Sequence, residues 1–210
     1  MVSYLPERTS LPLWMTVKQL QDFYEDFYAD FQRERSEEML DRLEISAKQR
    51  MKHMSKGTRE KVQLILAMSR QAKLYLLDEP IGGVDPAARD YILDTIIRNY
   101  NPEASVIIST HLIAEVADLI EHTVIIRKGR ILQDAPTEEL TAACWAVSGP
   151  AGVVDSWAAG RDVFTSSVLG GLKTVCIRGG GTEDLPAGLE RRRVGLQEYF
   201  ISLMEEEDQR

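Results

Sequence analysis

Two short apolar segments, each followed at once by polar residues, constrain the fold of this chain more than any other feature. The first is Leu74–Leu77, which runs into Asp-Glu-Pro at 78–80, and the second is Ser105–Thr110, which runs into His111. Apolar runs of this length are typical of strands buried in a parallel sheet. The segment 86–99 between them opens with a proline, which suits the first turn of a helix. This alternation predicts an α/β fold with a mainly parallel sheet.

The segment before the first of these strands is expected to be mostly helical. Residues 1–15 contain two prolines, Pro6 and Pro12, and are expected to pass from a strand into a loop. Thr16 can cap a helix over 17–33, and a second helix is expected over about 36–49. A Ser-Lys-Gly turn at 55–57 opens a third. The aromatic side chains at helical spacing in 17–33 are expected to pack in a core.

The last third of the chain has a different composition. A helix over 111–120 and strands over 122–127 and 130–134 are expected to complete the first part. Residues 141–194 are rich in Gly, Ala, Ser and Val, and an amphipathic helix is expected over 195–205. The chain is therefore predicted to comprise a domain over 1–140 and a small α+β appendage over 141–210 that ends in a helix.

Charge and hydropathy exclude several classes of function. The chain has 33 acidic and 25 basic residues, a net charge of −8, which disfavours a nucleic-acid partner because phosphate backbones would repel it. A membrane-spanning helix needs about 20 apolar residues, and the apolar runs here are far shorter. Arg8 interrupts any apolar core of a secretory signal. Cys144 and Cys176 are expected to be free thiols, as suits a reducing compartment.

The polar residues that follow the two strands are candidates for chemistry. In open α/β sheets, ligands bind at the carboxyl ends of the strands. Asp78 at such an end could hold Mg²⁺ beside a nucleotide phosphate, and Glu79 could orient and deprotonate a water. His111 would lie at the same edge and could donate to a phosphate or to that water. Each residue alone also suits a purely structural role.

The segment 54–59, Met-Ser-Lys-Gly-Thr-Arg, is a second candidate. Ser55 and Gly57 open a helix and leave backbone N–H groups unpaired, which together with the helix dipole form an anion site. Lys56 adds a positive charge. The alternative interpretation is an ordinary capped helix.

Taken together, the order and spacing of these elements resemble the ATP-binding cassette (ABC) ATPase family. Met54–Thr58 resembles the signature motif, Leu74–Glu79 the Walker B strand, and Gly83–Asp85 the D-loop. Ser109–His111 resembles the switch-histidine segment, and Ser3–Glu7 the strand that enters the Q-loop. The resemblance covers residues 1–140.

The resemblance implies a partial P-loop NTPase core, with a helical subdomain over 8–54 and a signature-to-switch core over 55–140. It implies that Glu79 is the general base, that His111 senses the γ-phosphate and that Asp78 binds Mg²⁺. The ATP contacts that it implies are Ser55, Lys56, Gly57, Thr58, Asp85 and Glu7.

The resemblance also implies partners. Family members hold ATP between two ATP-binding subunits arranged head to tail, in a homodimer or heterodimer, and work with a transmembrane permease subunit. The implied location is cytoplasmic and peripheral, on the inner face of the cell membrane. Lys56 and the Pro-Glu pair at 6–7 resemble the exporter branch, and Leu11, Leu13 and Trp14 are candidates for the permease contact.

One departure from the family pattern is large. The sequence contains no G-x-x-x-x-G-K-[S/T], the Walker A loop that cradles the phosphates, and we expect about 80 residues upstream to be missing. Glu7 stands where the family usually has glutamine.

Three functions remain open. The first is the ATP-hydrolysing subunit of an ABC exporter. The second is a non-hydrolytic cassette that lends Ser55 and Gly57 to an intact subunit. The third is a soluble ABC ATPase of DNA repair or translation, which the absence of coiled-coil insertions and tandem cassettes disfavours.

Overall fold

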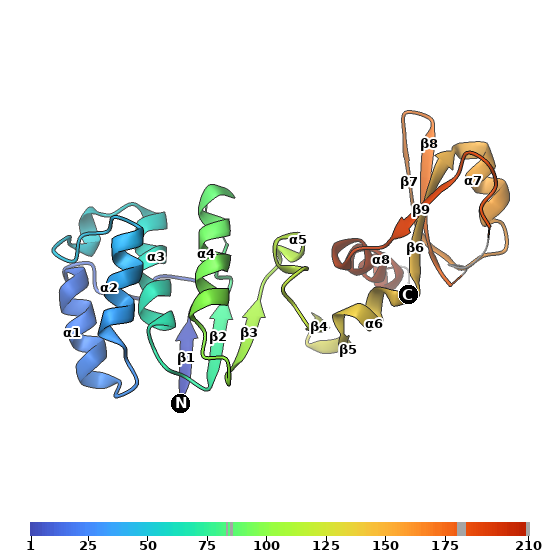
Figure 1. The fold of residues 1–210 in the computed structure, drawn as a ribbon. Coiled ribbons are helices and arrows are strands. Elements are labelled where there is room, and N and C mark those ends of the chain that lie inside the picture. The colour runs from blue at the N-terminus through green and yellow to red at the C-terminus, as the bar shows by residue number, and fades with distance from the viewer. Residues whose placement is uncertain (83, 85, 180–183, 209–210) are drawn as a thin grey trace. The chain divides into compact units, whose positions relative to one another are not determined.

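A computed structural model describes residues 1–82, 84, 86–179 and 184–208 of the chain. It contains two compact units, Met1–Leu112 and Ile113–Arg210, and each is described here by itself (Figure 1). The domain boundary predicted near residue 140 follows the extent of the family resemblance and stays a prediction.

A parallel sheet forms the centre of the first unit. Its strands are β1 (Val2–Leu5), β2 (Leu74–Asp78) and β3 (Ser105–Ser109), in the order β1-β2-β3. Both neighbouring pairs are parallel, as the two apolar segments predicted. The carboxyl ends of the three strands therefore meet at one edge of the sheet.

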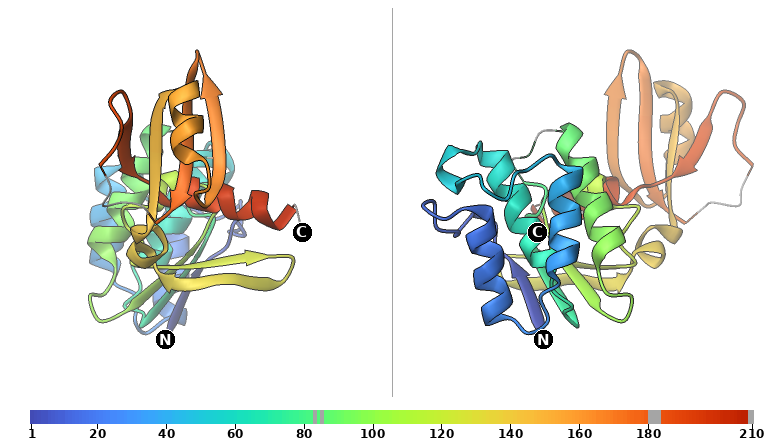
Figure 2. Two further views of the ribbon diagram at one scale, coloured as in Figure 1. Left: turned by 90° about the vertical axis from the view of Figure 1, so that its right-hand side faces the viewer. Right: turned by 60° about the vertical axis from the view of Figure 1, so that its left-hand side comes forward.

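Helices lie on one side of this sheet (Figure 2). They are α1 (Val17–Phe27), α2 (Arg33–Arg42), the 3₁₀ helix Met51–His53, α3 (Lys56–Met68) and α4 (Pro86–Asn99). Helix α3 is central, because it contacts β1 as well as α1, α2 and α4. Its residues from Val62 to Met68 are all buried. The largest side chains fully buried in this unit are Leu20, Met39, Met51, Leu64, Ile65, Leu66, Met68, Tyr75, Leu77, Ile81 and Ile92.

The opposite face of the same sheet is open. Side chains alternate between the two faces of a strand. In β1, Ser3 and Leu5 are buried, whereas Val2 and Tyr4 are 48% and 58% exposed. Ile107 of β3 is 56% exposed. Parallel sheets are normally covered on both faces, so this apolar face is unusual.

The helix predicted over 17–33 is too long, because α1 ends at Phe27. Backbone bonds to the segment between α3 and β2 replace helical bonds: Gln71 N–H donates to the Asp30 carbonyl, and Gln32 N–H donates to that of Ser69. The helix predicted over 36–49 is also misplaced, since α2 ends at Arg42. Glu44 there has a φ of 55°.

The second unit is an α+β structure, as predicted for the C-terminal part. It contains α5 (Ile113–Val116), which is much shorter than the helix predicted over 111–120, and a hairpin of β4 (His122–Arg127) and β5 (Arg130–Pro136). There follow α6 (Thr137–Ala142), β6 (Cys144–Pro150), α7 (Ala151–Ala158), β7 (Val163–Leu169), β8 (Leu172–Arg178), β9 (Glu190–Arg193) and α8 (Leu196–Asp208).

Strands β6 to β9 form an antiparallel sheet in the order β7-β8-β6-β9, the arrangement of a split β-α-β motif. One hydrophobic cluster joins Ala146 and Cys176 of the sheet to Tyr199 of α8. Another joins Val147 to Val154 of α7, which lies along the sheet in Figure 2. Both cysteines are free and buried. No helix in the described part of the chain is long and apolar enough to cross a membrane.

Candidate functional site

Glu79 stands at the turn that follows β2, and its backbone is unusual. Its φ is 47°, in the left-handed region that residues other than glycine rarely adopt. Backbone strain of this kind concentrates at functional sites, where the surrounding contacts hold it. Glu79 is therefore a candidate on conformational grounds as well as chemical ones.

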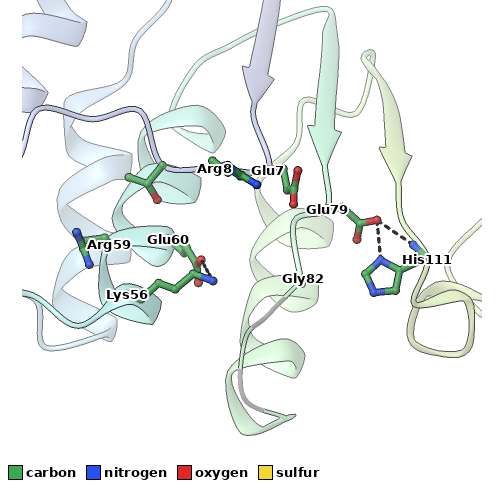
Figure 3. Close-up of a pocket in the computed structure, with 9 residues that line it drawn as sticks. Glu7, Arg8, Lys56, Arg59, Glu60, Glu79, Gly82 and His111 are labelled. Carbon is green, nitrogen blue, oxygen red and sulfur yellow. Dashed lines mark hydrogen bonds and ion pairs between the residues drawn. The ribbon is translucent and has the colours of Figure 1, made fainter.

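The carboxylate of Glu79 is held by the segment that follows β3. Thr110 Oγ1 donates to Glu79 Oε2 at 3.1 Å, and His111 N–H donates to Oε1 at 3.1 Å. The Nδ1 atom of His111 lies 2.8 Å from the same Oε1. Figure 3 shows the contacts between His111 and Glu79 as dashed lines. The structure thus brings together the two residues that the sequence predicts to be catalytic.

Asp78 lies at the same edge, one residue before Glu79. Ser109 Oγ donates to Asp78 Oδ1 at 2.6 Å, which fixes the carboxylate but leaves lone pairs free. Within the described residues, no group of three His, Cys, Asp or Glu side chains could hold a metal ion. Mg²⁺ beside phosphates usually needs only one or two protein carboxylates, so Asp78 has the donor chemistry that such an ion requires.

The turn after Glu79 is closed by Gly82. Gly82 N–H donates to the Glu79 carbonyl at 3.0 Å. A Cβ on Gly82 would lie 3.2 Å from both Cβ and the carbonyl oxygen of Glu79. The absence of a side chain at Gly82 lets the turn pass directly against Glu79.

A pocket of about 420 Å³ opens beside Glu79 and His111 (Figure 3). It is lined by Glu7, Arg8, Thr9, Lys56, Arg59, Glu60, Glu79, Gly82 and His111. Acidic and basic side chains are equally represented. The side chain of His111 is 73% exposed, so a ligand in the pocket could reach its ring, although Nδ1 contacts Glu79. A smaller hollow of about 20 Å³ includes Asp78 in its lining.

The predicted signature residues form the beginning of α3. Ser55 is the N-cap, and its Oγ accepts the N–H of Thr58 at 3.1 Å and lies 2.8 Å from Thr58 Oγ1. Lys56 Nζ lies 3.6 Å from Glu60 Oε1. Ser55, Gly57 and Thr58 are absent from the pocket lining, whereas Lys56 is part of it. Of the predicted residues at the start of α3, only Lys56 therefore lies in the same pocket as Glu79 and His111.

Two polar residues of α3, Glu60 and Gln63, were not predicted, and Arg59 was predicted only as the last residue of the segment 54–59. Arg59 Nε, Glu60 Oε2 and Gln63 Oε1 are buried and have no hydrogen-bond partner among the described residues. The Nε2 atom of Gln63 donates to the Pro6 carbonyl at 3.1 Å. Lys56, Glu60 and Gln63 share a helix face at a spacing of three to four, which is the signal that could have identified Glu60 and Gln63.

The remaining predicted residues are Glu7 and Asp85. Glu7 follows β1, is exposed and lines the pocket near Glu79 (Figure 3). Asp85 lies outside the described residues.

The chain is similar in sequence and in structure to several known proteins. A family model described as "AAA domain, putative AbiEii toxin, Type IV TA system" matches residues 18–117, just under half of the chain. The chain is 28% identical over 144 residues to "Uncharacterized ABC transporter ATP-binding protein YhaQ" of Bacillus subtilis, covering 66% of this chain and 48% of that protein. It is 37% identical over 90 residues to "Molybdenum import ATP-binding protein ModC" of Rhodopseudomonas palustris, covering 42% of this chain and 24% of that protein.

A solved structure described as "Structure of ATP binding subunit of ABC transporter" is also similar. It superposes with a TM-score of 0.60 and is 26% identical, over 66% of this chain and 60% of that one. The α/β fold predicted from the sequence is therefore confirmed. The chain spans about half the length of YhaQ.

Proposed function

Since this chain is homologous to the ATP-binding proteins of ABC transporters, we propose that it is part of an ATP-hydrolysing subunit that works with a transmembrane partner. The proposal rests on the carboxylate of Glu79. Both of its oxygens accept hydrogen bonds, and it lies at the edge where the parallel strands end. A base fixed in this way needs no reorganisation before it accepts a proton from water.

In the proposed reaction, Glu79 orients the attacking water and accepts its proton. Oε1 accepts the backbone N–H of His111 and contacts the ring, whereas Oε2 has one contact, from Thr110. Oε2 is thus the better placed oxygen to take the proton. Asp78 would hold Mg²⁺, which when bound supplies positive charge to the phosphates. The exposed ring of His111 would donate to the γ-phosphate.

Ser55, Lys56, Gly57 and Thr58 are proposed to contact a nucleotide held by a second ATP-binding subunit. Ser55, Gly57 and Thr58 lie at the start of α3 outside the lining of the pocket beside Glu79, which supports a separate role, whereas Lys56 also lines that pocket. Unpaired N–H groups of a helix start favour an anion. Asp85 is proposed to line the interface with that second subunit, and Glu7, in the lining of the pocket beside Glu79, is proposed to contact the nucleotide there, near Mg²⁺.

The transmembrane partner is proposed to bind near the exposed residues Leu13 and Trp14, together with Leu11. We propose accordingly that the subunit lies on the cytoplasmic face of a membrane. Export is proposed as the direction, from the Lys56 and Pro6-Glu7 pattern. One relative is named as a molybdenum import protein, so the relatives do not favour export over import. The proposal of export rests on the sequence pattern alone.

One observation favours a second candidate function. The sequence contains no G-x-x-x-x-G-K-[S/T], and no other segment supplies the lysine and glycine-rich backbone that hold β- and γ-phosphates. A cassette without this loop could lend Ser55 and Gly57 to an intact subunit and hydrolyse nothing itself.

The two functions are separated in two steps. The reading frame upstream of the Met1 codon is first searched for a Walker A motif, which we expect to find. In the chain extended by that frame, Glu79→Gln should lower phosphate release about 100-fold or more with ATP binding retained, because a general base contributes about 10²–10⁴. Glu103→Gln, at an exposed loop position, is the control. Turnover of Glu79→Gln within twofold of wild type would remove Glu79 from the base role, and an upstream stop codon would favour the non-hydrolytic partner.

A further inference from the structure

The two edges of the four-stranded sheet in the second unit differ in charge. One edge is β9, whose four residues, Glu190–Arg193, are all charged. The other edge is β7, and its seven residues, Val163–Leu169, include no charge and no proline. Charges and prolines are the usual protection of edge strands against pairing with another chain. Edge β9 has this protection and edge β7 lacks it.

The usable part of the β7 edge is Thr165–Leu169. The register with β8 shifts between Val163 and Thr165, and such a bulge interrupts pairing at that end. Among the described residues, no strand pairs with the outer side of β7. Val168 and Leu169 at the far end are 64% and 85% exposed. An uncharged and partly apolar strand segment is therefore exposed to solvent.

We propose that this edge pairs with the same edge of a second copy of the chain. Antiparallel pairing of one strand with its own copy has twofold symmetry, so the segment is complementary to itself. Centred on Ser167, the pairing sets Ser167 opposite Ser167 of the partner subunit, and Leu169 opposite Thr165 of the partner subunit. The two sheets then form one continuous sheet.

The same geometry limits the assembly to two copies. Pairing β7 with β9 of the next copy would repeat without closing, but the row of charges on β9 opposes it. Self-pairing of Thr165–Leu169 sets no like charges opposite each other, because the segment has none. This contact is independent of the nucleotide-dependent pairing proposed above.

A charge-swap experiment on the full 210-residue chain tests the proposal without nucleotide. Sedimentation equilibrium should show a dimer for the wild-type chain. Ser167→Lys and Ser167→Glu should each raise the dimer dissociation constant at least about tenfold, because like charges would meet at the twofold axis. An equimolar mixture of the two variants should dimerise again.

Two matched controls carry the same added charge elsewhere. Gln197→Lys lies on the exposed side of α8 in the same unit, and Ile107→Lys lies on β3, an uncharged edge strand of the other unit. Both variants should dimerise like the wild type. Loss of the dimer in Ile107→Lys alone would place the contact on β3 and overturn the proposal.

A cross-linking experiment reads the register directly. Paired residues on antiparallel strands have Cα atoms about 4.5–5.5 Å apart, within the range of a disulfide. Under mild oxidation Ser167→Cys should form a covalent dimer, and Gln197→Cys should not. The native thiols should stay unreactive, because burial raises the pKa of Cys144 and raises that of Cys176 to about 11.

Three results would overturn the proposal. The first is a wild-type chain that stays monomeric at 100 times the concentration of a routine assay. The second is a Ser167→Lys chain that dimerises like the wild type. The third is a Ser167→Cys chain that does not cross-link although the wild type is dimeric.

Discussion

Gly82 is the residue on which the position of Glu79 depends most directly. Its backbone N–H closes the turn onto the Glu79 carbonyl, and its missing side chain leaves room for Glu79 Cβ. Glu79 in turn has a left-handed backbone, which the turn and the contacts from Thr110 and His111 maintain. A change at Gly82 therefore acts on Glu79 before it acts on anything else.

Gly82→Ala is expected to destabilise the turn by about 1–3 kcal/mol, the usual cost of overpacking. The new methyl group would meet Glu79 backbone at 3.2 Å, and backbone cannot rotate away as a side chain can. Hydrogen exchange of peptides from β2 and β3 measures the effect locally.

Gly152→Ala is the control for this substitution, because nothing lies within 4 Å of its added Cβ and the position is helical. It should be neutral or stabilising by up to about 1 kcal/mol. Equal exchange in Gly82→Ala and the wild type would show that the turn tolerates a side chain.

Glu198 gives a pH-dependent prediction for the second unit. Its carboxylate accepts a hydrogen bond from Arg192 at 2.7 Å and one from Gly195 N–H at 3.1 Å. The Arg192 guanidinium, foremost, holds the pKa of Glu198 below its ordinary value. The stabilisation is therefore complete above the ordinary glutamate pKa of about 4.3 and is lost as the pH falls through the lower, folded value.

Glu198→Gln should accordingly lower the midpoint of thermal unfolding at pH 7. The difference in midpoint from the wild type should become smaller as the pH falls below about 4. Glu205→Gln, exposed on the same helix, serves as the control. A deficit in Glu198→Gln that is as large at pH 3 as at pH 7 would contradict a role for the ionised carboxylate.

The sequence anticipates the site residues whose position follows from strand order. Asp78, Glu79 and His111 each end or follow a strand, so parallel pairing alone brings them to one edge. The left-handed backbone of Glu79 has no sequence signal, because glutamate is not a residue that favours it. Glu60 was missed, and Arg59 was given no role of its own, because their place in the pocket depends on how α3 packs on β1.

Arg70 connects several elements of the first unit at once. Its guanidinium donates to both carboxylate oxygens of Asp30, at 2.9 and 3.1 Å, and to the Val2 carbonyl at 2.7 Å. It also lies 3.8 Å from the centre of the Tyr28 ring. The pair is buried, with side chains only 9% and 5% exposed. Arg70 thus joins the end of α1, the start of β1 and the end of α3.

Arg70→Met should destabilise the first unit by about 3–5 kcal/mol, because it leaves the Asp30 carboxylate buried and unpaired. Replacing both residues, in Arg70→Met with Asp30→Leu, should cost less than the single change. Hydrogen exchange of β1 and α3 peptides measures both.

Arg98→Met is the matched control, since Arg98 pairs with Asp94 on an exposed helix face. Exposed pairs contribute about 0–1 kcal/mol. If Arg70→Met behaved like this control, the buried pair would not be what holds the three elements together.

Element boundaries were harder to predict than element types. Helix α2 ends in a Schellman motif, in which Ile45 N–H donates to the Leu40 carbonyl and Glu44 N–H to that of Asp41. Glycine normally takes the left-handed position of this motif, and Glu44 takes it here. With no glycine as a signal, the periodic pattern suggested a helix that continues to 49. Strands β2 and β4 were predicted closely because polar or turn residues bound them.

At the scale of the whole molecule, the chain combines a well-formed carboxylate site with a sequence that has no phosphate loop. We expect the 210-residue chain by itself to release no phosphate from ATP above the rate of buffer alone, because nothing in it cradles the β- and γ-phosphates. A phosphate-release assay with Mg²⁺ and ATP tests this. If the 210-residue chain hydrolysed ATP and Glu79→Gln abolished that activity, another set of residues would have to hold the phosphates.

The open apolar face of the first sheet, with Val2, Tyr4 and Ile107 toward solvent, has a consequence for the life of the chain in a cell. Chaperones and proteases continually select polypeptides by the apolar surface that they leave exposed. A copy whose face stays bare would be degraded faster than one whose face is covered. The steady-state amount of this protein would then follow the supply of whatever covers the face, and not its own rate of synthesis alone.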